Sequence, residues 1–255
     1  MMVTTLRRHL RLGALFLIAL PVFCWLQWQP KAWFDHQLAA QGMRVGLHYQ
    51  SLHKAFPGLQ LDGVQISAPG IDTLNLDTLL LRPALSSLLK GSPALFARTQ
   101  GKGMSAEAVV NMGNAGPNLS DGEIRADAST LSRFDTRLLL LGLQGNVKLH
   151  GRMQLQATDG LPLDGDIHLV WNKPSSTLLP PGLDQIRLTL AAADAQGEKI
   201  WNWKLTSQPE MIVGQGKVMA GGPDIRQWLL RGTLRTATDQ PELVLSGTLG
   251  APHWQ

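Results

Sequence analysis

Hydrophobic and polar residues alternate along most of this chain, and the alternation is clearest over residues 145–171. Between positions 146 and 157 the odd residues are apolar or small and the even residues are polar. Successive side chains of an extended strand point to opposite faces, so a period of two predicts a strand with one apolar face. After a turn at 159–162 the same phase resumes and continues to Trp171. The segment is therefore predicted to be an antiparallel hairpin.

Similar alternation elsewhere predicts further strands, at 43–50, 59–67, 73–82, 95–98, 105–112, 123–128, 185–192, 199–206, 211–220, 232–237 and 243–249. Short helices are expected at 83–90, 129–141 and 223–230, although the second could break after Asp135 and continue as a strand. Loops are expected at 114–122 and 172–182. The apolar phase switches at Gly63, which is typical of a β-bulge.

About ten or eleven amphipathic strands would present a large apolar face, and about three or four short helices are too few to cover it. The sheet must therefore curl, close, or be covered by lipid or a partner. We predict an all-β domain over residues 43–255, a long curled antiparallel β-meander that forms an open groove or a flattened barrel. An antiparallel sandwich is the alternative.

The segment 12–28 carries no charged residue across its 17 positions. This length is near the lower limit of the ~17–25 residues that a membrane-spanning helix needs. Arg7, Arg8 and Arg11 precede it, and the positive-inside rule places them in the cytoplasm. We therefore predict a cytoplasmic tail over 1–11, a transmembrane anchor over 12–28 and a linker or short helix over 29–42.

The N-terminal segment also allows a cleaved signal peptide or a buried core helix. A cleavage site would need small residues after the apolar run, whereas the sequence offers Phe23, Cys24 and Trp25. An uncleaved anchor is therefore the preferred interpretation. In the anchored and the cleaved cases, the residues after position 29 lie across the membrane from the cytoplasm.

The net charge of +4 does not indicate a nucleic-acid partner. Three of the 23 Lys and Arg residues lie in the tail, which leaves 20 basic against 19 acidic residues scattered over the remainder. A nucleic-acid reader normally gathers its positive charge on one surface. The single cysteine, Cys24, excludes an intrachain disulfide.

No catalytic motif is present: the chain has no G-x-S-x-G, no H-E-x-x-H and no cysteine pair for zinc. We predict no catalytic residues and no cofactor, and expect the protein not to be an enzyme. The group most similar to a ligand set is His150, Asp164, Asp166 and His168, on the polar faces of the paired strands. Cross-strand neighbours come within about 5 Å, so a metal site is conceivable. A solvated face of mixed charge explains these residues better, and we predict no metal site.

The apolar positions of the central strands, with two tryptophans that share one face of a later strand, are candidates for an apolar groove. They are Val147, Leu149, Met153, Leu155, Ile167, Leu169, Trp171, Trp201 and Trp203. Trp228 is a further candidate for this apolar groove. The same residues would face inward as ordinary protein core, and the sequence does not separate the two interpretations.

Several features occur together: an N-terminal apolar helix, amphipathic strands, a strand ending in Arg82–Pro83 with SSLLKG, then GLQGNVKLHGRMQLQ and a strand ending at Trp171. In this arrangement, over most of residues 10–250, the chain resembles the type II secretion system protein N family of Gram-negative bacteria. The resemblance implies a single-pass inner-membrane component of the machinery that exports folded proteins, with its bulk in the periplasm and with other secretion components as partners.

The recurrent strand phrases LDGVQIS, LDGDIHLV and LRGTLRT are also similar to those of AsmA-like proteins. Curled sheets of that type are thought to carry lipid in a groove. This similarity implies an alternative function, a periplasmic module that binds or transfers lipid acyl chains on its apolar sheet face.

Overall fold

The computed structural model describes residues 30–32, 35–36, 46–68, 71–84, 87, 94–101, 103–113, 116–133, 136–156, 161–195, 198–222, 224–236 and 242–254. The chain separates into two compact units, Met1–Gly42 and Met43–Gln255. In the first unit, residues 30–32 and 35–36 are helical, within the predicted linker or short helix. The predicted tail with Arg7, Arg8 and Arg11, and the predicted anchor over 12–28, lie outside the described residues. Within the described ranges, no helix has the length and apolar character needed to cross a bilayer.

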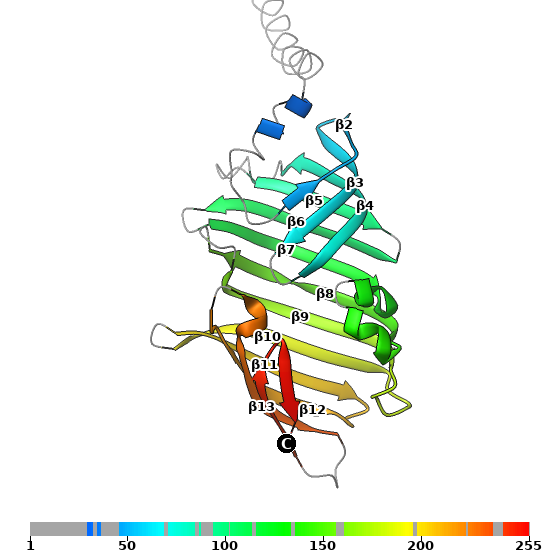
Figure 1. Ribbon diagram of the computed structural model, residues 1–255, viewed down its shortest axis with the longest axis vertical. Helices are drawn as coiled ribbons and strands as arrows, with labels where there is room; N and C mark the ends of the chain where they lie inside the picture. Colours follow the sequence, from blue (N-terminus) through cyan, green and yellow to red (C-terminus); the bar gives the residue numbers. More distant parts are fainter. Residues whose placement is uncertain are drawn as a thin grey trace, which may run out of the picture. The chain divides into compact units, whose positions relative to one another are not determined.

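The second unit is an antiparallel meander, as the alternation predicts (Figure 1). In the part of the chain that the structure describes, its 15 strands form one continuous sheet in which nearly every strand pairs with its neighbours in sequence. The strands are β1 (Gly46–His48), β2 (Ser51–Ala55), β3 (Gly58–Ala68), β4 (Ile71–Pro83), β5 (Ala94–Gly101), β6 (Met104–Gly113), β7 (Gly116–Asp127), β8 (Gln144–Leu155), β9 (Pro162–Ser175), β10 (Gln185–Ala195), β11 (Glu198–Gln208), β12 (Val213–Met219), β13 (Leu229–Arg235), β14 (Leu243–Thr248) and β15 (Ala251–Trp254). The alternative of two packed sheets is wrong for these residues.

The central hairpin is confirmed as β8 and β9, and its register explains the alternation. Val147 pairs with Trp171 and Leu149 pairs with Leu169, while His150 pairs with His168 between them. Residues paired across an antiparallel ladder share a face, so the apolar sets of both strands lie on one side. The same parity continues through β10 and β11, where Ile167 pairs with Leu190 and Leu190 with Trp203.

The structure corrects two of the predicted loops and helices. Residues 114–122, predicted as a loop, lie largely in β7, which begins at Gly116. Pro83 ends β4, so the helix predicted over 83–90 does not begin there, although Ser87 within that range is helical.

Apart from Ser87, which is helical, the helices described in the second unit are short 3-10 turns: η1 (Ala128–Arg133), η2 (Thr136–Leu141) and η3 (Ile225–Gln227). The predicted helix over 129–141 is thus divided into η1 and η2. Asp224 caps η3, because its carboxylate accepts a hydrogen bond from the Arg226 backbone N–H at 2.8 Å. Few helices therefore cover the sheet, as expected from the sequence.

At Gly63 the alternation of apolar residues along β3 shifts from one face of the strand to the other. Leu61 lies on one face of β3 and Val64 on the other, and both are fully buried. Gly63 has a positive φ of 59°, a conformation that glycine adopts at little cost. The ladder stays in register there, and the shift between β3 and β4 falls between Ile66 and Ala68. The prediction of a bulge at Gly63 was therefore wrong in position.

In the described chain, two clusters of buried apolar side chains lie in the C-terminal half of the sheet. A core cluster there consists of Trp201, Trp203, Val218, Trp228 and Leu245. A second cluster consists of Leu183, Ile186 and Ile212, with Trp171 packed against it. These residues come from β10 to β14 and from the loops beside them, so the sheet supplies its own core without a covering layer of helices.

Candidate functional site: an apolar trough on one face of the sheet

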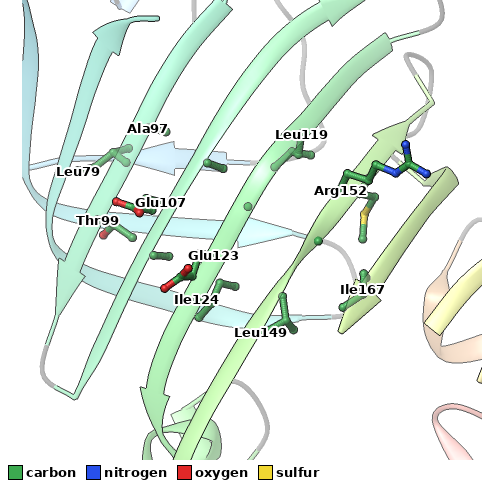
Figure 2. Close-up of a pocket in the computed structure, with 15 residues that line it drawn as sticks. Leu79, Ala97, Thr99, Glu107, Leu119, Glu123, Ile124, Leu149, Arg152 and Ile167 are labelled. Atoms are coloured by element: carbon green, nitrogen blue, oxygen red, sulfur yellow. The ribbon is translucent and has the colours of Figure 1, made fainter. Parts of the chain in front are cut away.

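We name the face that carries Leu149, Ile167 and Trp203 the trough face, because hollows lined by apolar side chains lie along it. The first of these, the N-side hollow, has a volume of about 290 Å³. Its apolar lining comes from β4 to β9 (Figure 2) and comprises Leu79, Ala97, Ala106, Ala108, Leu119, Ile124, Leu149, Met153 and Ile167. Ladder partners connect them, since Leu79 pairs with Thr99, Thr99 with Ala106 and Ala106 with Ile124.

The N-side hollow offers few groups for polar recognition. Thr99 lines it, but its hydroxyl already donates to the Thr78 carbonyl oxygen at 2.6 Å. Glu107, Glu123 and Arg152 also border it, and the register places Glu123 and Arg152 on the opposite, polar face, paired with His150 and Asp166. The trough face itself therefore presents almost only carbon atoms here.

A second hollow of about 400 Å³, the C-side hollow, lies on the same face. Its lining comes from β8 to β14 and adjoining turns, and includes Met153, Pro162, Ile167, Leu188, Leu190, Trp201, Trp203, Val218, Trp228, Leu230, Leu245 and Leu249. Met153 on β8 and Leu245 on β14 border one cavity although several strands separate them in the sheet. The sheet must therefore bend across this region to bring them together.

Met153 and Ile167 line both hollows, so the two form one apolar trough that crosses from β4 to β14. Gly151 pairs with Ile167 and Gly165 pairs with Met153 at this junction. A Cβ atom at Gly151 would collide with the Asp166 carbonyl oxygen, and one at Gly165 would collide with the Arg152 carbonyl oxygen. The two glycines therefore let the backbones of β8 and β9 approach closely at the boundary that the hollows share.

The tryptophans on and beside the trough differ in hydrogen bonding. Trp171 donates its indole N–H to the Gln144 carbonyl oxygen at 2.9 Å, and Trp228 donates to the Gly222 carbonyl oxygen at 3.2 Å. Trp201 and Trp203 are 2% and 8% exposed, and their indole N–H groups have no partner among the described residues. A buried donor without an acceptor costs about 1–3 kcal/mol.

The opposite face of the central strands is polar and solvated. The rings of His150 and His168 stack with centroids 5.1 Å apart. Asp166 accepts a hydrogen bond from Arg152 and lies 3.4 Å from the Nε2 atom of His168. Within the described ranges, no group of three or more His, Cys, Asp or Glu side chains is placed to hold a metal ion.

The ion pairs on this face shift the pKa values of its carboxyls. The Arg152 guanidinium, through its hydrogen bond to Asp166, holds the pKa of that carboxyl below its ordinary value. Arg125 does the same to the pKa of Glu123, assisted by Lys148, whose Nζ atom is 3.3 Å from the carboxylate. Lowered carboxyl pKa values next to exposed cations are typical of a stabilised surface, in contrast to the raised values that acid catalysts use.

The structure distributes the nine predicted groove residues unevenly. Met153 and Ile167 line both hollows, Leu149 lines the N-side hollow, and Trp201 and Trp203 line the C-side hollow. Val147 is buried and Trp171 packs against the second core cluster, so both act as core. The remaining two, Leu155 and Leu169, line neither hollow, although the register places Leu169 on the trough face.

Sequence reasoning missed the parts of the trough that lie far from the central hairpin. On the N-terminal side these are Leu79, Ala97, Ala106, Leu119 and Ile124, and on the C-terminal side Leu188, Leu190, Leu230 and Leu245. Apart from Leu119, which lies in a segment predicted as a loop and before a register shift, they sit on the apolar phase of their strands, so the alternation contained the signal. What it lacked was the register that aligns one strand with the next.

Comparison of the chain with known protein families, with curated proteins and with solved structures finds no match in any of the three.

Proposed function

We propose that this protein is a non-enzymatic component of the type II protein secretion machinery, anchored in the inner membrane by residues 12–28 with its β domain in the periplasm. The resemblance of its strand phrasing to the protein N family supports this role. The observation that carries the proposal is the open sheet: among the described strands, β15 pairs only with β14, and β2 pairs only with β3. A strand with an unpaired edge accepts a strand from another protein by backbone hydrogen bonding.

Site-specific photo-crosslinking in cells tests this proposal. A photoreactive amino acid at His253, on the exposed edge strand β15, should form adducts with other secretion components. The same group at Lys204, which is exposed on the interior strand β11, should not form them. Deleting the gene should also reduce export of the secreted substrates. Normal export after deletion, together with no adducts from His253, would overturn the proposal.

A second function, binding of lipid acyl chains, is favoured by the two adjoining apolar hollows of the trough. Ligand pockets commonly measure about 300–1,000 Å³ and are lined mainly by apolar side chains. The C-side hollow, of about 400 Å³, lies in this range and the N-side hollow, of about 290 Å³, lies just below it, and both are bordered by Met153 and Ile167.

Native mass spectrometry of the full-length protein tests the second function, with a charge placed at the junction of the hollows. The wild-type protein should retain stoichiometric acyl lipid, and Ile167→Glu should lose it. His168→Glu is the matched control, because this neighbour on the same strand points to the polar face. Equal lipid retention by all three proteins, or none by the wild type, would exclude an acyl site in the trough.

A further inference from the structure

Exposed leucines gather at one end of the central strands, outside the trough. Leu139 and Leu140 are 64% and 84% exposed on η2, and Leu178 is 75% exposed in the loop after β9. Among the described residues, these three leucines are more exposed than any other leucine. Burying a leucine side chain is worth about 1.5–3 kcal/mol, so leaving several in water at one place needs an explanation.

Hydrogen bonds hold the two leucine segments together although more than thirty residues separate them in sequence. The Leu141 carbonyl oxygen accepts from the backbone N–H of Thr177 at 3.0 Å and from the hydroxyl of Ser176 at 2.9 Å. Gln144 pairs with Ser175, so η2 and the loop leave the sheet at the same end (Figure 1). We name this unit, residues 138–143 with 176–183, the leucine tip.

Several backbone N–H groups of the leucine tip are satisfied by hydrogen bonds within the tip. The Gly142 N–H donates to the Leu139 carbonyl oxygen at 3.4 Å, and the Leu178 N–H donates to the Ser176 hydroxyl at 3.3 Å. The Leu179 N–H donates to the Ser176 carbonyl oxygen at 3.3 Å. Internal pairing of this kind is what a lipid environment requires, because hydrocarbon offers no partner to a free N–H or C=O group.

The charge pattern of the leucine tip agrees with a lipid surface. Residues 138–143 and 176–183 include no charged side chain. In sequence a basic residue precedes each segment, Arg137 before the first and Lys173 before the second, while the acidic Asp184 follows the second. Apolar residues flanked by cations are typical of segments that enter the headgroup layer of membranes with anionic lipids.

We propose that the leucine tip docks into the surface of a phospholipid bilayer. Leu139, Leu140 and Leu178 enter the layer between headgroups and acyl chains, and the strands behind them stay in water. A protein partner is less suited to this tip, because a protein interface normally has a polar rim, whereas the leucine tip carries no charged side chain. The proposal depends neither on the secretion role nor on a ligand in the trough.

Spin labels on the full-length protein test the docking. In a Cys24→Ser background, Leu140→Cys or Leu178→Cys carries a nitroxide, and Val244→Cys on the outer face of β14 is the matched control. The labelled protein is reconstituted in vesicles of phosphatidylethanolamine and phosphatidylglycerol, with protein-free vesicles of the same composition added. Collisions with a water-soluble nickel chelate should fall several-fold at positions 140 and 178 relative to position 244, while collisions with oxygen rise.

A second variant tests whether the leucines themselves cause the protection from nickel. Combining Leu139→Asp and Leu140→Asp with the label at 178 should restore nickel access at that position. Nickel access at 140 and 178 equal to that at 244 would overturn the proposal. Protection from both nickel and oxygen would also overturn it, because it would indicate a protein partner or a second copy. Unchanged nickel access at position 178 in the variant with the two aspartates would overturn it as well.

Discussion

The indole of Trp203 on β11 lies over its ladder partner Gly216 on β12. A side chain at Gly216 would collide with this indole. A Cβ atom at Gly216 would stand 2.7 Å from the Cε2 atom of Trp203 and 2.6 Å from the Cα atom of Gly232. Gly232 is the ladder partner of Gly216 on the next strand. The Trp203 indole lies against these two glycines.

Gly216→Ala should therefore destabilise the β domain by about 1–3 kcal/mol, the usual cost of overpacking a filled core. The displaced atoms include backbone of β13, which cannot move aside as a flexible side chain would. Urea unfolding of the full-length protein in detergent, followed by tryptophan fluorescence, measures the difference. Gly101→Ala is the control, because its Cβ atom would meet nothing closer than 3.9 Å. Equal stability of the two variants would contradict this packing.

The hydrogen bonds of the tryptophans predict an order of stability between two similar substitutions. Trp201→Phe and Trp228→Phe remove the same atoms from residues that are 2% and 4% exposed. Only the second breaks a hydrogen bond, because Trp228 donates to Gly222 and Trp201 has no partner among the described residues. In lipid-free protein, Trp228→Phe should cost about 1 kcal/mol more than Trp201→Phe. The same urea titration measures both, and the reverse order would show that an acceptor reaches Trp201.

The buried Leu61 and the exposed Leu140 should differ sharply in what they contribute to the free energy of unfolding. Leu61 is 0% exposed, and Leu61→Ala should cost about 2–5 kcal/mol through lost burial and the cavity left behind. Leu140 is exposed, and Leu140→Ala should change the free energy of unfolding by less than about 0.5 kcal/mol. Thermal unfolding of both variants beside the wild type checks the pair. A large loss at Leu140 would mean that the leucine tip belongs to the core.

Acid should weaken the polar face through Asp166. Its folded-state pKa lies below the ordinary value because Arg152 favours the charged carboxylate. The folded state therefore binds fewer protons than the unfolded chain, and this stabilisation is present above the ordinary aspartate pKa of about 3.9. It is lost as the pH falls through the lower, folded-state pKa. Because the pair is exposed to solvent, the effect is small.

The Arg152→Gln variant tests this ion pair directly. Its Asp166 carboxyl should titrate at a higher pH than that of the wild type when followed by the carboxyl carbon resonance. An unchanged titration would show that the pair does not persist in solution. The Lys173→Gln variant should leave the titration of Asp166 unaltered, because Lys173 forms no part of this pair.

The metal hypothesis for the histidine pair stays open to a simple measurement. Arg152 already donates a hydrogen bond to Asp166, and the stacked rings of His150 and His168 face one another. We expect no stoichiometric shift of their ring resonances when zinc is added to the full-length protein. A saturable shift at one equivalent would show a site that the polar face assembles only around the metal.

The alternation of residues by itself determined that the chain beyond the predicted anchor is a meander of two-faced strands, and it placed residues such as Leu149, Ile167 and Trp203 on the apolar face. This succeeded because the period of two is a local property of an extended backbone. It failed where local signals compete, as at 114–122, where Gly and Asn suggested a loop and pairing with β6 and β8 made a strand. Only the tertiary structure decided that Met153 and Leu245 share one hollow, that Gly216 makes room for Trp203, and that Leu140 and Leu178 form one tip. Each of these depends on ladder register and on the bend of the sheet, and both are set by contacts between residues far apart in the chain.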